Sequence, residues 1–285
     1  MPRHEFNYPK EAQNTVNRYK HQATYSLTTI HTIINTSPIL NVSFNAPSSP
    51  FPITLPLIGQ MGSFDRPSAS LGEPLDLYLH GYVSSRIMNL SRASSSKKEG
   101  EGEGEGEGKG LPVCIAASKV DGLVLSLTPN SHNYNYRSAV LFGYANIVES
   151  VEEKLYAMEL ITNSVLPSRW QNTRIPPNAA EMSSTSILRV TITSGSAKVR
   201  SGVPVDEKGD LENEEVLDRV WTGVVPLYEV YGEPVPGPYN RVKEVPGYVG
   251  RWVEGVNEEG RSYAVEGAKR DAPVPGKKER DEEEG

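Results

Sequence analysis

The pattern of apolar and polar positions predicts a chain built mainly of short β-strands. Apolar residues alternate with polar ones over 40–44, 53–57 and 75–80, and this period of two is typical of strands buried on one face. Prolines between the first two segments mark a turn. Further strand-like segments are 112–118, 122–128, 137–148, 188–192 and 221–232, and the first two of these are predicted to form a hairpin across Val120-Asp121-Gly122.

Three segments have the apolar spacing of an amphipathic helix. Residues 24–36 and a short stretch near 85–92 show this period, as does 151–166. The third segment follows Ser150 and Glu153, whose spacing is that of a capping box at a helix start. The predicted core faces are Leu27, Ile30 and Ile34 in the first helix, and Val151, Leu155, Met158 and Val165 in the third.

The order of these elements favours an antiparallel barrel with helices packed around it. Strands follow one another without the regular strand–helix alternation that a parallel, doubly wound sheet requires. Neither a GxGxxG motif after a strand nor a Walker A motif is present. The predicted fold class is therefore mainly β with helices.

Composition divides the chain into an arm, one large domain and a tail. Residues 1–22 are polar and are predicted to form an N-terminal arm, and 23–236 hold the predicted domain. Within that domain the Glu-Gly repeat of 94–110 has no apolar residue to bury, so we expect a disordered loop insertion there. Residues 237–285 are expected to form a polar, largely disordered tail.

Charge and cysteine content exclude several classes of function. The net charge is −7, and residues 206–285 hold 20 acidic and 11 basic residues, whereas the remainder holds 16 acidic and 18 basic residues. A nucleic-acid-binding protein is disfavoured because it would need a basic face. The single cysteine, Cys114, forms no internal disulfide framework, and the five histidines show no zinc-ligand spacing, so no metal is expected.

No segment is predicted to cross or enter a membrane. The N-terminus is polar, and no run approaches the roughly 18 apolar residues that a membrane span needs. We therefore expect a soluble, cytoplasmic protein.

The segment LYLHGYVSSR, residues 77–86, carries the most informative chemistry. A strand ends at His80-Gly81, and Ser84, Ser85 and Arg86 follow where a helix is predicted to begin. Backbone N–H groups at a helix start, two hydroxyls and a guanidinium are the donors that a phosphate dianion needs. These residues predict a binding site for a phosphorylated ligand.

Two further segments combine cations with small or hydroxylated neighbours. NSHNYNYRS, residues 130–138, contains His132 and Arg137, and SAKVRSG, residues 196–202, contains Lys198 and Arg200. Each of these residues also has a purely structural interpretation. Arg137 would pair with a carboxylate in the dimer interface, and His80 would close a strand through a turn hydrogen bond. His132 would belong to a polar loop that caps one end of the barrel, and Lys198 and Arg200 would line a solvated strand edge.

Several segments, taken in order, resemble a known family. They include PITLPLIG, LYLHGYVSSR, SAKVRSG and WTGVVPL, within a match over roughly residues 18–235. The chain resembles the pyridoxamine 5′-phosphate oxidase-related flavin-binding proteins, in the branch of the nitroimidazole-resistance reductases and flavin-nucleotide-binding proteins. The resemblance implies an antiparallel Greek-key split barrel and a homodimer with FMN in the cleft between its subunits.

The resemblance also implies roles for individual residues. Ser84, Ser85 and Arg86 would bind the FMN phosphate, and His80 would lie near the flavin, where it would position an acceptor or supply a proton. The strand segment with Ile53, Leu55 and Pro56 would run beside the edge of the flavin ring. His132, Arg137, Lys198 and Arg200 would complete the site, with the cations coming from the partner subunit.

The function expected from this resemblance is that of an FMN-dependent oxidoreductase. It would pass electrons from a reduced donor to a small organic acceptor, such as a nitro compound or quinone, or to oxygen. No residues are recognised that would fix a second, pyridoxal-type phosphate, so pyridoxamine-phosphate oxidase activity is not expected. The alternatives are a flavin- or haem-binding module without turnover, in which His80 or His132 would be an axial ligand, and a dimeric scaffold whose site has decayed.

Overall fold

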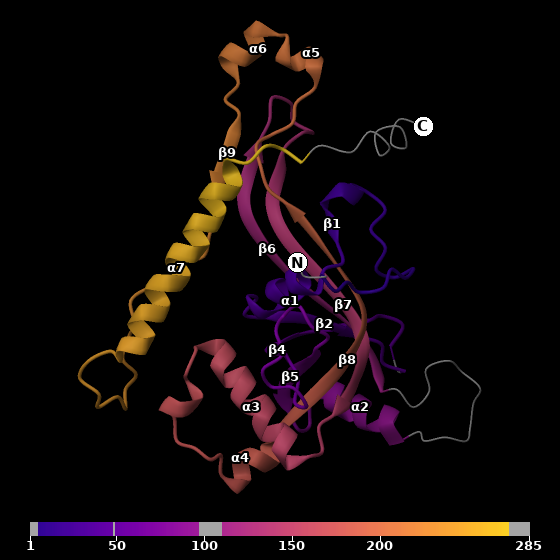
Figure 1. The fold of residues 1–285 in the computed structure, drawn as a ribbon, viewed down its shortest axis with the longest axis vertical. Helices are drawn as coiled ribbons and strands as arrows, with labels where there is room; N and C mark the ends of the chain where they lie inside the picture. Colours follow the sequence, from indigo (N-terminus) through magenta and orange to yellow (C-terminus); the bar gives the residue numbers. More distant parts are fainter. Residues whose placement is uncertain (1–4, 48, 97–109, 274–285) are drawn as a thin grey trace. The chain divides into compact units, whose positions relative to one another are not determined.

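A nine-stranded sheet with surrounding helices forms the framework of the protein (Figure 1). The structure is a computed structural model, and it describes residues 5–47, 49–96 and 110–273. The Glu-Gly residues 97–109 and the tail residues 274–285 lie outside the described part, and so do the predictions made for them. The strands are β1 (Ala23–Thr24), β2 (Leu40–Phe44), β3 (Ile53–Leu57), β4 (Gly59–Gly62), β5 (Asp76–Tyr82), β6 (Leu111–Leu125), β7 (Asn133–Ile147), β8 (Thr185–Arg200) and β9 (Gly223–Pro226). The α-helices are α1 (Leu27–Asn35), α2 (Arg86–Ser96), α3 (Val151–Val165), α4 (Ala179–Ser184), α5 (Lys208–Leu211), α6 (Glu214–Arg219) and α7 (Gly247–Ala268), and the 3-10 helices are η1 (Lys20–Gln22) and η2 (Trp170–Asn172).

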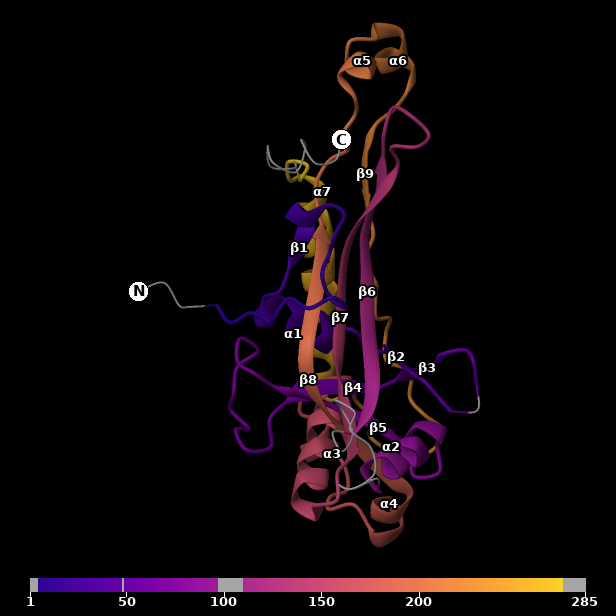
Figure 2. The ribbon, with the colours of Figure 1, turned by 90° about the vertical axis from the view of Figure 1, so that its right-hand side faces the viewer.

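The strand pairing confirms the predicted fold class. The order in the sheet is β3-β2-β6-β7-β8-β5-β4, with β1 beside β8 and β9 beside β6, and Figure 2 shows the long strands β6, β7 and β8 side by side. The pairs β2–β3, β2–β6, β4–β5, β5–β8 and β6–β9 are all antiparallel. Among the described residues β3 and β4, at the two ends of the order, do not pair with each other, so the sheet is not closed.

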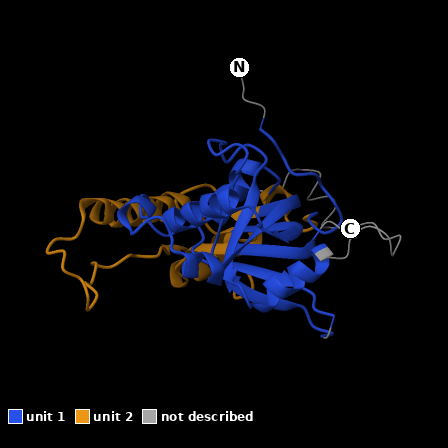
Figure 3. Cartoon of the chain, turned by 90° about the horizontal axis from the view of Figure 1, so that it is seen from below, with its two compact units in different colours: residues 1–15, 24–117, 138–197 blue, residues 16–23, 118–137, 198–285 orange. Residues whose placement is uncertain are grey.

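The chain forms two compact units (Figure 3), and the domain predicted over 23–236 contributes residues to both of them. Unit 1 holds residues 1–15, 24–117 and 138–197, and unit 2 holds 16–23, 118–137 and 198–285. Strands β6, β7 and β8 contribute residues to both units. Composition alone shows no boundary here because the division falls inside continuous strands.

The core of unit 1 lies between the sheet and its helices. Leu77 and Leu79 of β5 are fully buried and pair in register with Val190 and Leu188 of β8, and α1 buries the predicted face of Leu27, Ile30 and Ile34. These are the positions that the period of two, and the helical period, assign to the core.

Helix α3 has the predicted start but only part of the predicted core face. The Ser150 side chain accepts a hydrogen bond from the Glu153 backbone N–H, which is one half of the predicted capping box. The Glu153 side chain instead accepts from Tyr78 and Arg189. However, Val151 and Val165 are exposed, whereas Ala157 and Ile161 pack against Tyr78 and its neighbours. The prediction is right for Met158, which packs against the same cluster, and wrong for the two valines, which lie at the ends of the helix and face solvent.

The N-terminal residues pack into unit 1 instead of extending as a polar arm. Tyr8 is buried, and its backbone N–H donates to the Tyr25 carbonyl over 2.9 Å. The Asn14 side chain donates to the carbonyls of Pro9 and Gly195 over 2.8 and 2.9 Å. Polar side chains that satisfy backbone carbonyls let this segment be buried at little cost.

Unit 2 corrects three predictions from the sequence. The Val120-Asp121-Gly122 turn does not form, because β6 continues through it and Gly122 pairs with Pro226 of β9. The last strand, β9, covers only 223–226 of the predicted 221–232. Residues 247–268 form helix α7 instead of a disordered tail, with Ala264 and Gly267 buried.

Candidate functional site

The end of β5 and the start of α2 bring together the residues predicted to bind phosphate. The chain turns between them through a hydrogen bond from the Ser85 N–H to the Tyr82 carbonyl (2.9 Å), and α2 begins at Arg86. The first backbone N–H groups of a helix have no partner within the helix, and the helix dipole favours an anion there. Ser84 and Arg86 are exposed at this point.

The state of the Ser85 hydroxyl indicates whether the site fits an anion. Its Oγ atom is buried and has no hydrogen-bond partner among the described residues. An unsatisfied buried hydroxyl costs about 1–3 kcal/mol, so such groups are rare unless a ligand or water completes them. The chemistry of Ser84, Ser85 and Arg86, all donors, fits a phosphate group.

His80 lies near the end of β5, four residues before Ser84. Its backbone N–H donates to the Ile58 carbonyl over 3.0 Å, and the residue is exposed although Tyr78 on the same face of the strand is buried. Partial desolvation of the ring lowers the pKa of His80 below its ordinary value. At neutral pH the imidazole is therefore uncharged, which suits a hydrogen-bonding or ligating group better than a cation.

Strand β3 supplies the residues predicted to run beside a flavin ring. Ile53 and Leu55 are half-buried and Pro56 is exposed. Because β3 pairs only with β2 and ends the strand order, its other edge has no strand partner among the described residues. Backbone donors and acceptors on such an edge are available to a ligand.

Arg137 is engaged within unit 2 by a buried carboxylate. Its Nε and one terminal nitrogen donate to the two carboxylate oxygens of Asp121 over 2.9 and 2.6 Å. Its guanidinium also lies 3.8 Å from the centroid of the Tyr263 ring in α7. This bidentate, stacked arrangement gives Arg137 a structural role. Its carboxylate partner is Asp121 of the same chain, whereas the structural interpretation from the sequence placed the partner in a dimer interface.

We expect Arg137→Gln to destabilise the protein by about 2 kcal/mol, because Asp121 would be left buried without its partner. Urea unfolding at pH 7 measures this, and Arg137→Lys should recover only part of the loss because lysine lacks the bidentate fork. An unchanged unfolding free energy, together with a large loss of flavin affinity, would instead assign Arg137 to the ligand site.

The other predicted cations of unit 2 are also held by protein groups. Arg200 is buried, where it donates to the side chain of Asn135 and to the carbonyls of Gly202 and Val203. Lys198 donates to the Arg18 carbonyl over 3.1 Å. His132 is exposed, and its Nδ1 accepts from the Ser126 N–H over 3.4 Å. Contacts of Arg137, Lys198, Arg200 and His132 with a ligand therefore stay a prediction.

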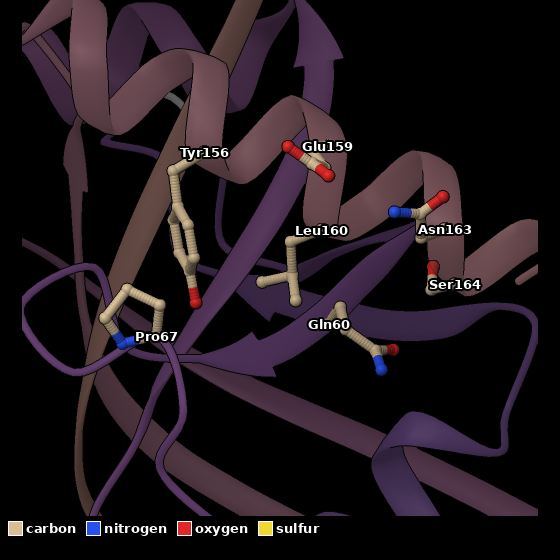
Figure 4. A pocket seen from close by; sticks show the side chains of 7 residues that line it. All are labelled: Gln60, Pro67, Tyr156, Glu159, Leu160, Asn163 and Ser164. Atoms are coloured by element: carbon tan, nitrogen blue, oxygen red, sulfur yellow. The ribbon is translucent and has the colours of Figure 1, made fainter. Parts of the chain in front are cut away.

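A pocket in unit 1 is a feature separate from the predicted site. It has a volume of about 410 Å³ and lies between α3, β4 and the loop that contains Pro67 (Figure 4). No cation lines it, and none of the predicted site residues does either, so its chemistry does not suit a phosphate. The lining residues are Gln60, Pro67, Tyr156, Glu159, Leu160, Asn163 and Ser164.

Comparison with known proteins identifies the family. Residues 26–199 match the family model of pyridoxamine 5′-phosphate oxidase. The chain belongs to the pyridoxamine 5′-phosphate oxidase family. The match includes β5, the start of α2 and the residues 80–86 discussed above. No curated protein matches the chain.

Two solved structures share the fold of this family member over most of their length. The flavocytochrome Anf3 from Azotobacter vinelandii has a TM-score of 0.65 and 23% identity, with 85% of this chain and 97% of that chain covered. The FAD and heme binding protein from Mycobacterium smegmatis has a TM-score of 0.63 and 22% identity, with 81% and 97% covered.

Two features are absent from the residues that the structure describes. None of the helices in 5–47, 49–96 and 110–273 combines the length and apolar character needed to span a membrane. In the same residues no group of three or more His, Cys, Asp or Glu side chains is arranged to hold a metal ion.

The sequence reasoning missed the partners of its candidate residues. The local sequence predicts a turn at Asp121 and a disordered tail at Tyr263, yet both residues contact Arg137. An Asp within an apolar alternation is the one signal that pointed to a buried ion pair. Nothing in the sequence could reveal that the Ser85 hydroxyl has no partner.

Proposed function

We propose that this chain binds FMN and acts as a flavin-dependent oxidoreductase. The observation that carries the proposal is the unpartnered Ser85 hydroxyl beside Ser84, Arg86 and the first turn of α2. Membership of the pyridoxamine 5′-phosphate oxidase family supports the same ligand class. The acceptor is proposed to be a small organic molecule, such as a nitro compound or a quinone, or oxygen.

Each residue of the site has a distinct task in this proposal. Ser84, Ser85 and Arg86 bind the phosphate and fix the position of the cofactor along the strand edge of β3. When bound, the flavin supplies the redox chemistry itself. Neutral His80 holds a hydrogen bond to the acceptor and orients it. We also propose that two copies of the chain form a homodimer and that the protein works in the cytoplasm.

The absorbance spectrum of the protein as purified tests this function. We expect the visible bands of an oxidised flavin, and mass spectrometry of the heat-released molecule should give the mass of FMN. Reduced nicotinamide with a quinone or nitro compound should then be turned over. A protein that carries no flavin and binds neither FMN nor FAD on reconstitution would overturn the proposal, whereas released FAD would correct the cofactor alone.

A haem-binding module is the second candidate. The two similar solved structures are described as a flavocytochrome and as a FAD and heme binding protein. Neutral His80 has the protonation state of an axial ligand. In contrast, the Nδ1 of His132 accepts a backbone hydrogen bond, which leaves the proton on Nε2. A Soret band on addition of haemin that His80→Ala abolishes and His132→Ala retains would favour this candidate.

A further inference from the structure

The segment 221–246 of unit 2, which we call the strap, presents apolar side chains to solvent. Ten large apolar residues between 221 and 245 are each at least 36% exposed, and Val235 and Tyr239 reach 89% and 94%. After β9 the strap has neither helix nor strand until α7 begins at Gly247. Apolar residues that gather in this way, rather than singly, mark an interaction surface.

The strap is held in place by its own unit. The Tyr231 N–H donates to Asn257 Oδ1 over 2.8 Å, and Asn257 Nδ2 donates back to the Tyr231 carbonyl over 2.9 Å. The Tyr231 ring also meets Trp252 of α7 edge-on, with centroids 4.8 Å apart. Prolines at 234, 236 and 238 restrict the backbone further. An organised segment loses less conformational entropy when it binds a partner.

The area and charge of the strap select the class of partner. Its exposed apolar side chains present on the order of 800 Å², which is about the area that each partner contributes to a stable dimer. The strap holds three acidic and two basic residues. It therefore lacks the basic surface that nucleic acids or anionic membranes require.

We infer that the strap docks on a second copy of this chain. The strap has 26 residues, and a stable interface uses about 20–30 residues on each side. In a two-fold dimer each copy would bury the strap of the other. Its low charge avoids repulsion between two copies that each carry −7. This inference rests on the proposed homodimer and adds the surface that holds it together.

The dimer dissociation constant of a strap variant tests the inference. Val235→Asp with Tyr239→Asp places two charges on the strap. We expect these charges to raise the dimer dissociation constant, measured by sedimentation velocity, at least 30-fold. The matched control is Ile39→Asp with Val151→Asp, which changes two exposed apolar residues of unit 1 and should leave the dissociation constant within threefold. Thermal unfolding should show that all variants remain folded.

The outcomes separate the strap from the homodimer proposal. A wild-type chain that is monomeric at tens of micromolar overturns both. A wild-type dimer whose dissociation constant is the same in the strap variant overturns the strap inference and leaves the homodimer standing. Flavin content, which reports on the phosphate site, is measured separately.

Photo-cross-linking identifies what the strap touches. Tyr239→p-benzoylphenylalanine, in an equal mixture of tagged and untagged chains, should give a covalent product containing one chain of each kind. A product linked only within one chain would show that the strap folds back on its own molecule, and this would overturn the inference.

Discussion

Replacing Ser84, Ser85 and Arg86 together with alanine should weaken FMN binding at least a hundredfold. A hydrogen bond to a charged group contributes about 1.5–3 kcal/mol, and the triple variant removes the guanidinium and two hydroxyls from a dianionic phosphate. A loss of about 3 kcal/mol corresponds to this factor. Titration calorimetry or quenching of flavin fluorescence on apoprotein measures the affinity.

Riboflavin provides the internal control for this experiment because it has the same ring and no phosphate. The triple variant should bind riboflavin as well as the wild type does, since only the phosphate contacts are lost. Arg174→Ala with Ser183→Ala, two exposed positions beside and within α4, controls for a general change of surface charge. FMN affinity that survives in the triple variant would place the phosphate elsewhere.

Acidification from pH 6.5 to 4 should remove about 3 kcal/mol of stability through His31 alone. His31 is fully buried, with Tyr8 Oη 2.7 Å from its Nε2 and the Leu71 carbonyl 2.7 Å from its Nδ1. Burial lowers the pKa of His31 to about 4, although the hydrogen bond to the Leu71 carbonyl opposes this shift. The neutral ring donates from Nδ1 to Leu71 and accepts from Tyr8.

The sign follows from proton binding in the two states. Between pH 6.5 and 4 the unfolded histidine takes up a proton and the folded one does not, so the unfolded state gains stability as the pH falls. The slope approaches about 1.4 kcal/mol per pH unit over this window. Well above pH 6.5 His31 is neutral in both states, and its contribution no longer varies with pH.

Urea unfolding of the wild type and of His31→Gln, at intervals from pH 7 to pH 4, isolates this contribution. Glutamine retains one donor and one acceptor but does not titrate, so the variant should show a shallower decline on acidification. Carboxylates also titrate in this pH range, but they change the unfolding free energies of both proteins equally. Identical slopes for the two proteins would show that His31 does not protonate on unfolding.

The features that could be predicted from the sequence are those that depend on residues close together in the chain. The alternation of Leu40, Val42 and Phe44 follows the burial of β2, and Ser150 caps α3 as its spacing requires. Both features depend on a few adjacent residues and on backbone geometry alone. Such interactions are visible in a sequence because they need no knowledge of register.

Features that depend on distant partners were not predictable. Asp121 favours a turn by its local preference, but the bidentate pair with Arg137 satisfies its carboxylate and lets β6 continue. Helix α7 cannot be predicted from its apolar spacing because glycines and charged residues interrupt that spacing. Its contact with Tyr231, through Trp252, is visible only in the folded structure. In the candidate site, the residue types were enough to predict a phosphate ligand. That Arg137 and Arg200 are hydrogen-bonded to protein groups could be learned only from the structure.

The path of the chain between the two units determines how the protein can be divided into fragments. Each unit is assembled from three separate stretches of sequence, and three strands pass from one into the other. No single cut can therefore release either unit as an intact fragment, because every cut leaves unpaired strand ends behind. Truncations intended to isolate the unit that carries the proposed phosphate site should yield insoluble products. Internal substitutions are the appropriate means of separating the contributions of the two units.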